Sequence, residues 1–312
     1  MPIKIPEKLP AYEVLKAEHI FVMDDERAIH QDIRPLKIAI LNLAPLKIAT
    51  ETQLLRLLGN TSLQIEITLL RTSTYQSKET PAEHLWNFYQ KFDQIGREYF
   101  DGLIITGAPV EHLAFEQVEY WEELKAFLNW SINHVFARLY LGWSAQAALF
   151  HHFGVPKVSS EVKQFGVYKH QVVAQDVDLL RGFDDTFYAP HSHQTEVRRS
   201  DIEKVRDLRI LAESKKAGVY IVESPLNRQV FITGQPEYDT LTLKNEYESN
   251  LAAGLPTAIP ANYFTENNPG KSPVVRWRGH SNLLFANWIN YCVYQETPYE
   301  IIQFNQYATT RL

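Results

Sequence analysis

The chain has 312 residues, of which 45% are hydrophobic and 22% charged, and its formal net charge is −6. This length allows one large core, and the acidic balance argues against nucleic acid or an anionic membrane surface as the main partner. The sequence contains no apolar stretch of membrane-spanning length and no apolar secretion signal, so we expect a cytoplasmic protein without membrane contact. The single cysteine, Cys292, excludes an internal disulfide, and its aromatic surroundings predict a buried, inert thiol.

Strand-like apolar runs alternate with helix-like segments in the first half of the chain. This alternation is typical of a parallel sheet covered by helices on both faces. The predicted strands are Leu36–Leu43, Ser62–Leu70, Phe100–Pro109 and His134–Leu141. The predicted helices are Thr50–Leu58, with Thr50 as its cap, Pro81–Lys91, with proline at a first helical position, and Glu116–Trp130.

Shorter strand-like runs follow after about residue 154, which predicts a mixed and partly antiparallel second half. They are Phe165–Val173, Leu208–Ala212, Val219–Glu223 and Gln229–Thr233, and an aromatic-rich segment from Lys271 ends in a predicted helix. No linker divides the chain, so residues 1–312 are predicted to form a single domain. Its parallel half spans about 36–154 and its mixed half about 155–300. The fold class is α/β, with a mostly parallel, doubly wound sheet.

The most informative segment is RLYLGWSAQAAL, residues 138–149. It predicts a buried strand that turns sharply into a helix at Gly142. Such a turn presents the side chain at the break beside backbone N–H groups that stabilise an oxyanion. Glycine has no side chain to present, so the turn predicts a nucleophile site without a nucleophile.

Blocks along nearly the whole chain resemble the homoserine O-acyltransferase family of methionine biosynthesis, which includes the homoserine transacetylases and transsuccinylases. The matching blocks include LNLAPLKIATETQ, FDGLIITGAPVE, GWSAQAALFHHFGVPK, KQFGVYKH, GFDDTFYAPHSHQTEV, GQPEYDTLTLKNEY and WRGHSNLLFANWINYCVYQETPY. The resemblance implies a class I glutamine amidotransferase-like (flavodoxin-like) fold and a homodimer. It also implies acyl transfer from an acyl-coenzyme A to homoserine through a cysteine thioester, with a histidine base oriented by a glutamate.

Three of the positions that the resemblance assigns to chemistry or substrate binding carry other residues here. The nucleophilic cysteine falls on Gly142, and the base falls on Gln235, whose amide has no useful proton affinity near neutral pH. The arginine used for the amino-acid substrate falls on Ser249. Glu237, the orienting carboxylate, is retained. The thioester route is therefore excluded at these positions.

Other positions match the family and imply a retained pocket. Lys163 and Ser192 correspond to residues that contact substrate, and they are expected to bind a small zwitterion. Glu111 falls where the family discriminates acyl donors. A glutamate there implies acetyl-coenzyme A, because it shortens the acyl pocket and repels a succinyl carboxylate. Acetyl-coenzyme A is the implied co-substrate, and no further cofactor is expected.

Several polar residues near the turn are candidates to replace the missing groups. Ser144 is a poor nucleophile candidate, because it is better placed to cap a helix beginning at Ala145. His191 and His193 either serve as a base for direct transfer or only form hydrogen bonds in the substrate loop. Neither this pair nor His151 and His152 has a third ligand at a readable spacing, so no metal site is expected.

The sequence favours structural or surface roles, rather than catalytic ones, for two carboxylates and one basic segment. Glu51 and Glu196 are expected to be a helix first-turn or surface acid rather than catalysts. The segment RWRGHSN, residues 276–282, is expected to pack as a late loop, because the acidic chain disfavours a nucleic-acid patch.

Two functions remain open. The first is acetyl transfer from acetyl-coenzyme A to the hydroxyl of homoserine or serine by direct attack, which retention of Glu111, Lys163 and Ser192 favours. The second is a catalytically inactive relative that binds an amino acid or an acyl-coenzyme A, or acts as a regulatory or structural partner. The joint changes at Gly142, Gln235 and Ser249 favour the second.

Overall fold

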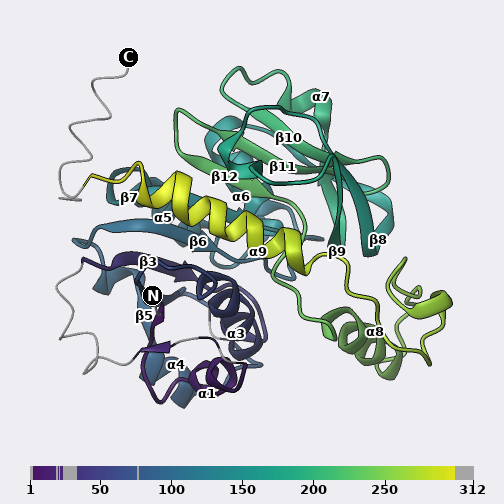
Figure 1. Ribbon diagram of the computed structural model, residues 1–312, viewed down its shortest axis with the longest axis horizontal. Helices are drawn as coiled ribbons and strands as arrows, with labels where there is room; N and C mark the ends of the chain where they lie inside the picture. The colour runs from purple at the N-terminus through teal and green to yellow at the C-terminus, as the bar shows by residue number, and fades with distance from the viewer. Residues whose placement is uncertain (1–2, 19, 21, 24–33, 76, 299–312) are drawn as a thin grey trace.

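The computed structural model describes residues 3–18, 20, 22–23, 34–75 and 77–298 (Figure 1). Twelve strands of this part form a single sheet. They are β1 (Ile3–Lys4), β2 (Val22–Met23), β3 (Leu36–Leu41), β4 (Ile65–Arg71), β5 (Tyr89–Lys91), β6 (Phe100–Ile105), β7 (Val135–Leu141), β8 (Lys157–Val172), β9 (Thr186–Val197), β10 (Arg209–Ser214), β11 (Gly218–Ser224) and β12 (Gln229–Ile232). The order is β2-β1-β4-β3-β6-β7-β12-β11-β10-β8-β9, with β5 beside β4.

The direction of pairing changes once across this sheet. All neighbours from β2 to β12, and the β4–β5 pair, are parallel. From β12 through β11, β10 and β8 to β9 the strands are antiparallel. The predicted mostly parallel sheet with a partly antiparallel second half is thus confirmed, and both kinds of strand share one sheet.

The helices of the described residues are α1 (Pro10–Ala17), α3 (Lys47–Leu58), α4 (Ala82–Phe88), α5 (Trp121–His134), α6 (Trp143–Phe153), α7 (Arg199–Ile202), α8 (Thr242–Ala252) and α9 (Arg278–Asn287), and α9 continues as a π-helix, η5 (Trp288–Tyr294). Helices α1, α3 and α9 pack on one face of the parallel part and α5 and α6 on the other, whereas α7 packs beside β10. Short 3-10 turns lie at Phe92–Gln94, Phe115–Gln117, Asp178–Leu180 and Thr265–Asn267.

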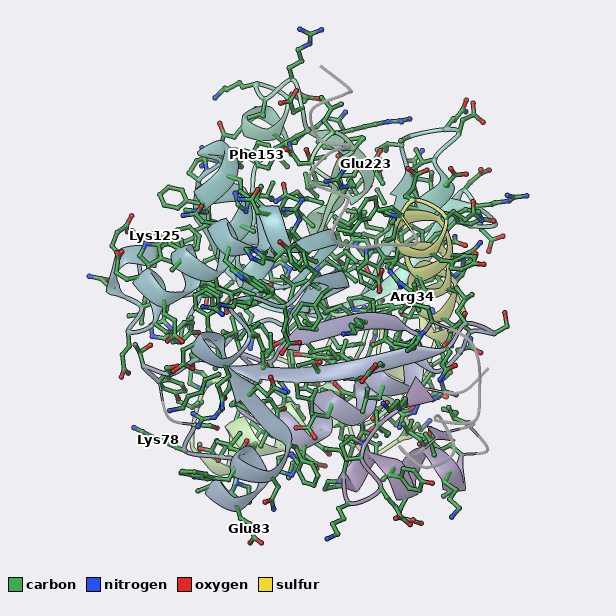
Figure 2. All side chains as sticks on the ribbon, turned by 90° about the vertical axis from the view of Figure 1, so that its left-hand side faces the viewer. Arg34, Lys78, Glu83, Lys125, Phe153 and Glu223 are labelled. Carbon is green, nitrogen blue, oxygen red and sulfur yellow. The ribbon has the colours of Figure 1, made fainter. Side chains whose placement is uncertain are left out.

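Strand β3 explains why both faces are covered. Its residues Ile38 and Ile40 belong to the core under α1, α3 and α9, whereas Ala39 and Leu41 belong to the core under α5 and α6. Successive side chains of a strand point to opposite faces, so a continuous apolar run requires helices on both sides. Charged side chains such as Lys78 and Glu83 point outward at the edge of the molecule (Figure 2).

Helix α8 lies away from the sheet, next to the end of the β8–β9 hairpin (Figure 1). Only Leu243 of this helix is buried, and it joins a small third core with Phe165, Tyr263 and Trp277. The polar side chains of α8 take no part in this core, so they can line a cavity between this core and the sheet.

Several predicted boundaries are wrong. The helix predicted from Thr50 begins at Lys47, without a side-chain cap. The helix predicted over Pro81–Lys91 ends at Phe88, and Tyr89–Lys91 form β5 beside β4. The helix predicted from Glu116 begins at Trp121, because Phe115–Gln117 make a separate turn.

The segment 276–282 also differs from its prediction. It was expected to be a loop, but from Arg278 onward it is the first turns of α9. Trp277, just before the helix, is buried and donates from Nε1 to the Tyr238 carbonyl at 2.8 Å. Within the described ranges, no helix has the length and apolar character needed to cross a bilayer.

Candidate active site

A cavity of about 1380 Å³ lies at the carboxyl ends of four neighbouring parallel strands. Strands β3, β6, β7 and β12 end at Leu41, Ile105, Leu141 and Ile232, and the residues that follow them form one wall. The β8–β9 hairpin and α8 form the other wall. Ligands of open α/β sheets bind at this edge, because loops from several strands converge there.

Gly142 forms the sharp turn that the sequence predicts. Its φ is 57° and its ψ is −125°, a left-handed conformation that residues with a side chain rarely adopt. Its N–H donates to the Ile232 carbonyl at 2.7 Å, which ties the turn to β12. Helix α6 begins at the next residue, Trp143, which lines the cavity. The geometry of a nucleophile turn is therefore present, with glycine at the position of the nucleophile.

Gln235 lies directly beside this turn. A Cβ atom built on Gly142 would lie 3.4 Å from Nε2 of Gln235. The Ser192 N–H donates to Oε1 of the same side chain at 2.9 Å, and only 8% of Gln235 is exposed. The structure thus places Gln235 where a side chain at position 142 would touch it, and neither residue can accept a proton near neutral pH.

Glu237 follows two residues later and also lines the cavity. Only 8% of Glu237 is exposed, and burial raises the pKa of its carboxyl to about 7. Within the described residues, Oε2 has no hydrogen-bond partner. A buried carboxylate without a partner is costly, and it is a feature of functional sites.

Lys163 and Ser192 meet on the hairpin side of the cavity. Nζ of Lys163 and Oγ of Ser192 both donate to Oε1 of Glu246, at 2.7 and 2.6 Å. Lys163 comes from β8, Ser192 from β9 and Glu246 from α8. The three groups form a compact polar cluster of a cation, a hydroxyl and an anion on the cavity wall. Ser249, one helical turn after Glu246, adds a neutral hydroxyl to the same wall.

Glu111 lines the cavity from the segment after β6, and its side chain contacts β9. Its Oε2 accepts the Gln194 N–H at 2.8 Å, and its backbone carbonyl accepts from Nζ of Lys157 at 2.6 Å. The side chain is therefore held in place and presents a negative charge to the cavity.

Ser144 is not where the sequence predicts it. The helix begins at Trp143 rather than Ala145, its N-cap is Gly142, and Ser144 makes no capping bond. Instead its buried Oγ donates to the Ile105 carbonyl at 2.7 Å and accepts the Leu141 N–H at 3.1 Å. The hydroxyl joins β6 to β7 beneath the turn.

Replacing Ser144 with alanine is expected to leave ligand binding unchanged and to lower the free energy of unfolding by about 1–2 kcal/mol, because buried backbone groups lose a partner. Urea denaturation and titration with acetyl-coenzyme A would measure the two quantities. A loss of binding at unchanged stability would contradict a purely structural role.

The histidines form a buried chain. Nδ1 of His191 contacts Nε2 of His193 at 2.7 Å, and Nε2 of His191 contacts Nε2 of His170 at 3.0 Å. Burial lowers the pKa of all three, to about 4 for His193 and about 3 for His170. Both nitrogens of His191 are thus occupied. His193 lines the cavity but directs Nε2 inward and buries Nδ1, so the chain fits the hydrogen-bonding interpretation better than the base interpretation.

Glu51 corrects the expectation of a first-turn or surface acid. It is fully buried in the second turn of α3, where it accepts from Nε2 of His84 at 2.9 Å and from the Tyr89 hydroxyl. Glu196 is half-buried on β9, outside the cavity lining. Cys292 is partly buried, and burial raises the pKa of its thiol to about 12, which makes it unreactive.

His151 and His152 lie outside the cavity lining, whereas His112, in the segment after β6, is part of it. His151 contacts Oδ1 of Asn129 at 2.8 Å, and burial lowers the pKa of His152 to about 3. Across the residues that the structure describes, no three His, Cys, Asp or Glu side chains gather in an arrangement that could hold a metal ion.

Two residues of the site were missed by sequence reasoning. Glu246 lies 54 positions from Ser192 and His170 lies 21 positions from His191, and each pair is brought together only by folding. No spacing rule relates α8 to the hairpin or fixes the register between β8 and β9, so these contacts carried no local signal.

Comparison with known proteins identifies the family. A family model described as homoserine O-succinyltransferase matches residues 2–299. A homoserine O-acetyltransferase from Acetivibrio thermocellus is 60% identical over 96% of this chain and 99% of its own length. One from Petrotoga mobilis is 58% identical over 98% of this chain and 99% of its own.

Solved structures agree on the fold. A glutamine amidotransferase from Thermotoga maritima superposes with a TM-score of 0.54 at 11% identity, covering 84% of this chain and 100% of the other. One from Methylobacillus flagellatus gives 0.50 at 12% identity, covering 83% and 95%. The amidotransferase-like fold that the sequence implied is therefore confirmed. Together with the near-complete match of the family model, these findings place the chain in the homoserine O-succinyltransferase family, whose members similar to it include homoserine O-acetyltransferases.

Proposed function

We propose that this protein transfers an acetyl group from acetyl-coenzyme A to the hydroxyl of homoserine or serine by direct attack in a ternary complex. The observation that carries the proposal is the intact cavity, in which Glu111, Lys163 and Ser192 face one space beside the turn at Gly142. The proposal includes a cytoplasmic homodimer, as the family resemblance implies.

Direct transfer needs no group at position 142. The acceptor oxygen attacks the thioester carbonyl carbon, the carbon–sulfur bond breaks, and coenzyme A leaves as a thiolate. The hydroxyl proton needs an acceptor, and Glu237 is the lining carboxylate whose pKa of about 7 suits that task near neutral pH. The proton then passes to the thiolate, which leaves Glu237 unchanged.

A second candidate is a catalytically inactive protein that binds an amino acid or an acyl-coenzyme A. The contact between Gly142 and Gln235 favours it, because the two positions that touch are the two that have no reactive group. Such a protein would keep the ligand-binding cavity and lack catalytic activity.

A thiol-release assay separates these functions. The purified protein is incubated with acetyl-coenzyme A and either homoserine or serine, and free coenzyme A is followed with a thiol reagent. Turnover above a heat-inactivated control supports the transferase, and a sequential kinetic pattern supports direct transfer. Tight acetyl-coenzyme A binding without turnover supports the inactive protein, whereas ping-pong kinetics would contradict the exclusion of a covalent intermediate.

Glu111 gives a further prediction about the acyl donor. Glu111→Ala removes a negative charge from the cavity wall, so succinyl-coenzyme A is expected to bind about tenfold more tightly than it binds the unsubstituted protein. Acetyl-coenzyme A affinity is expected to change less. Calorimetric titration with both donors measures the ratio, and an unchanged ratio would remove Glu111 from donor selection.

A further inference from the structure

The orientation of the Gln235 amide follows from its contact with Ser192. The backbone N–H of Ser192 can only donate, and it lies 2.9 Å from the side-chain amide of Gln235. The oxygen of the amide must therefore face Ser192, and the NH₂ group must occupy the other position. That position points toward Gly142, since Nε2 is the atom nearest to a Cβ built there.

A small niche lies between Nε2 of Gln235 and the turn. The position of a Cβ on Gly142 is 3.4 Å from Nε2 and 3.5 Å from Cα of Gly107. Apart from these two atoms and the chain neighbours of Gly142, no atom of the described residues lies within 4 Å of that position, so a ligand atom in van der Waals contact with Cα of Gly142 can lie in the open space beyond it. Gln235 is 92% buried by area, and none of the contacts of the described residues uses its NH₂ group.

The start of helix α6 adds a second source of donors. This helix has eleven residues, begins at Trp143 and has no side-chain cap at Gly142. The N–H of Ala145 donates to the Gly142 carbonyl at 3.1 Å, and none of the contacts of the described residues uses the N–H groups of Trp143 and Ser144. The helix dipole also makes this end favourable for negative charge. The niche therefore lies beside the Gln235 NH₂ group and the start of a helix, and it favours an acceptor oxygen.

We infer that the niche above Gly142 binds the carbonyl oxygen of an acyl thioester, with the Gln235 NH₂ group as a donor. The identity of the ligand as acetyl-coenzyme A rests on the proposed function, but the donor character of the niche does not. Position 235 thus holds and polarises the acyl group instead of accepting a proton. In direct transfer the same bond strengthens as the carbonyl oxygen gains charge.

Paired ligands test this inference by binding alone. S-ethyl-coenzyme A has the length of acetyl-coenzyme A but a thioether in place of the thioester, and so it lacks the carbonyl oxygen. The unsubstituted protein is expected to bind acetyl-coenzyme A about fivefold more tightly than S-ethyl-coenzyme A, as one buried neutral hydrogen bond predicts. The carbonyl stretch of ¹³C-labelled bound acetyl-coenzyme A is expected to shift to lower frequency.

Two substitutions remove the donor in different ways. Gln235→Glu keeps the oxygen that accepts from Ser192 and replaces NH₂ with a second oxygen, so at alkaline pH the preference is expected to vanish or reverse. Gly142→Ala fills the niche with a methyl group and leaves the charge unchanged, and it is expected to abolish the preference as well. Gln90→Glu, the same change at an exposed position, is the matched control and keeps the preference.

Each outcome decides between the two proposals. Equal affinity for both ligands in the unsubstituted protein, or a preference that survives both substitutions, would overturn the niche and leave the proposed function standing. A preference without any turnover supports the niche and counts against the transferase. If neither coenzyme A derivative binds at millimolar concentration, both proposals fall.

Discussion

Gly142→Cys combined with Gln235→His is expected to raise acetyl transfer to homoserine by about 10²- to 10⁴-fold over the unsubstituted chain, the usual gain from a positioned acid–base group. The turn is already formed, and a Cβ on residue 142 meets its neighbours at ordinary contact distances. The imidazole at position 235 would lie two residues from Glu237, whose Oε2 has no hydrogen-bond partner among the described residues. The site would then contain a nucleophile, a base and an orienting carboxylate.

The single variants are the controls for this result. Gly142→Cys alone lacks the imidazole at position 235, and Gln235→His alone lacks a thiol at position 142. Neither can use the thioester route, so both are expected to remain near the activity of the parent. The double variant is expected to gain the mass of one acetyl group when incubated with acetyl-coenzyme A, and to show ping-pong kinetics. A folded double variant at background activity would mean that the pocket has changed along with the reactive pair.

Glu237→Gln is expected to stabilise the folded protein at pH 8 by roughly 3 kcal/mol. Burial raises the pKa of this carboxyl from 4.5 to about 7, and each pKa unit corresponds to about 1.4 kcal/mol. The folded state holds the proton more tightly than the unfolded state. The stability of the parent should therefore fall as the pH rises from about 4.5 to about 7 and stay level above that.

Urea denaturation at a series of pH values measures this effect. The parent and Glu237→Gln curves should nearly coincide at low pH and separate between about pH 4.5 and pH 7. Glu79→Gln, the same change at an exposed position, should leave the parent curve unaltered. Parallel curves for Glu237→Gln and the parent over the whole range would show that the carboxylate is stabilised in the fold. A stabilised variant that has lost acetyl transfer would mark Glu237 as a functional group kept at a cost in stability.

The central strands of the sheet were predictable from the sequence because their side chains report directly on burial, whereas β1, β2, β5 and β9 were not predicted as strands. Leu36–Leu41 and Val135–Leu141 lie within one or two residues of their predicted bounds, since a central parallel strand is apolar at nearly every position. Helix ends were less predictable. Thr50 resembled a helix cap, yet α3 begins about one turn earlier, at Lys47.

The candidate site was predictable only where a motif carried it. Gly142 and Gln235 could be singled out from the resemblance to the family, and folding places them in contact. Glu51 was misjudged because an acidic residue near a helix start usually faces water, whereas here His84 and Tyr89 provide a buried partner set from a later segment. The contacts of Glu246 likewise depend on tertiary packing and leave no trace in sequence spacing.

Because the strand direction changes at β12, the residues of the site come from two parts of the sheet, one parallel and one antiparallel. Positions 142 and 235 follow β7 and β12, two neighbours paired in register through Leu141 and Ile232. Lys163 and Ser192 belong to the antiparallel hairpin instead. Under the proposed function, reactivity and substrate recognition therefore lie on separate parts of one sheet, so a mutation can change one and leave the other intact. This architecture makes the chain a natural starting point for installing new chemistry at a single strand junction.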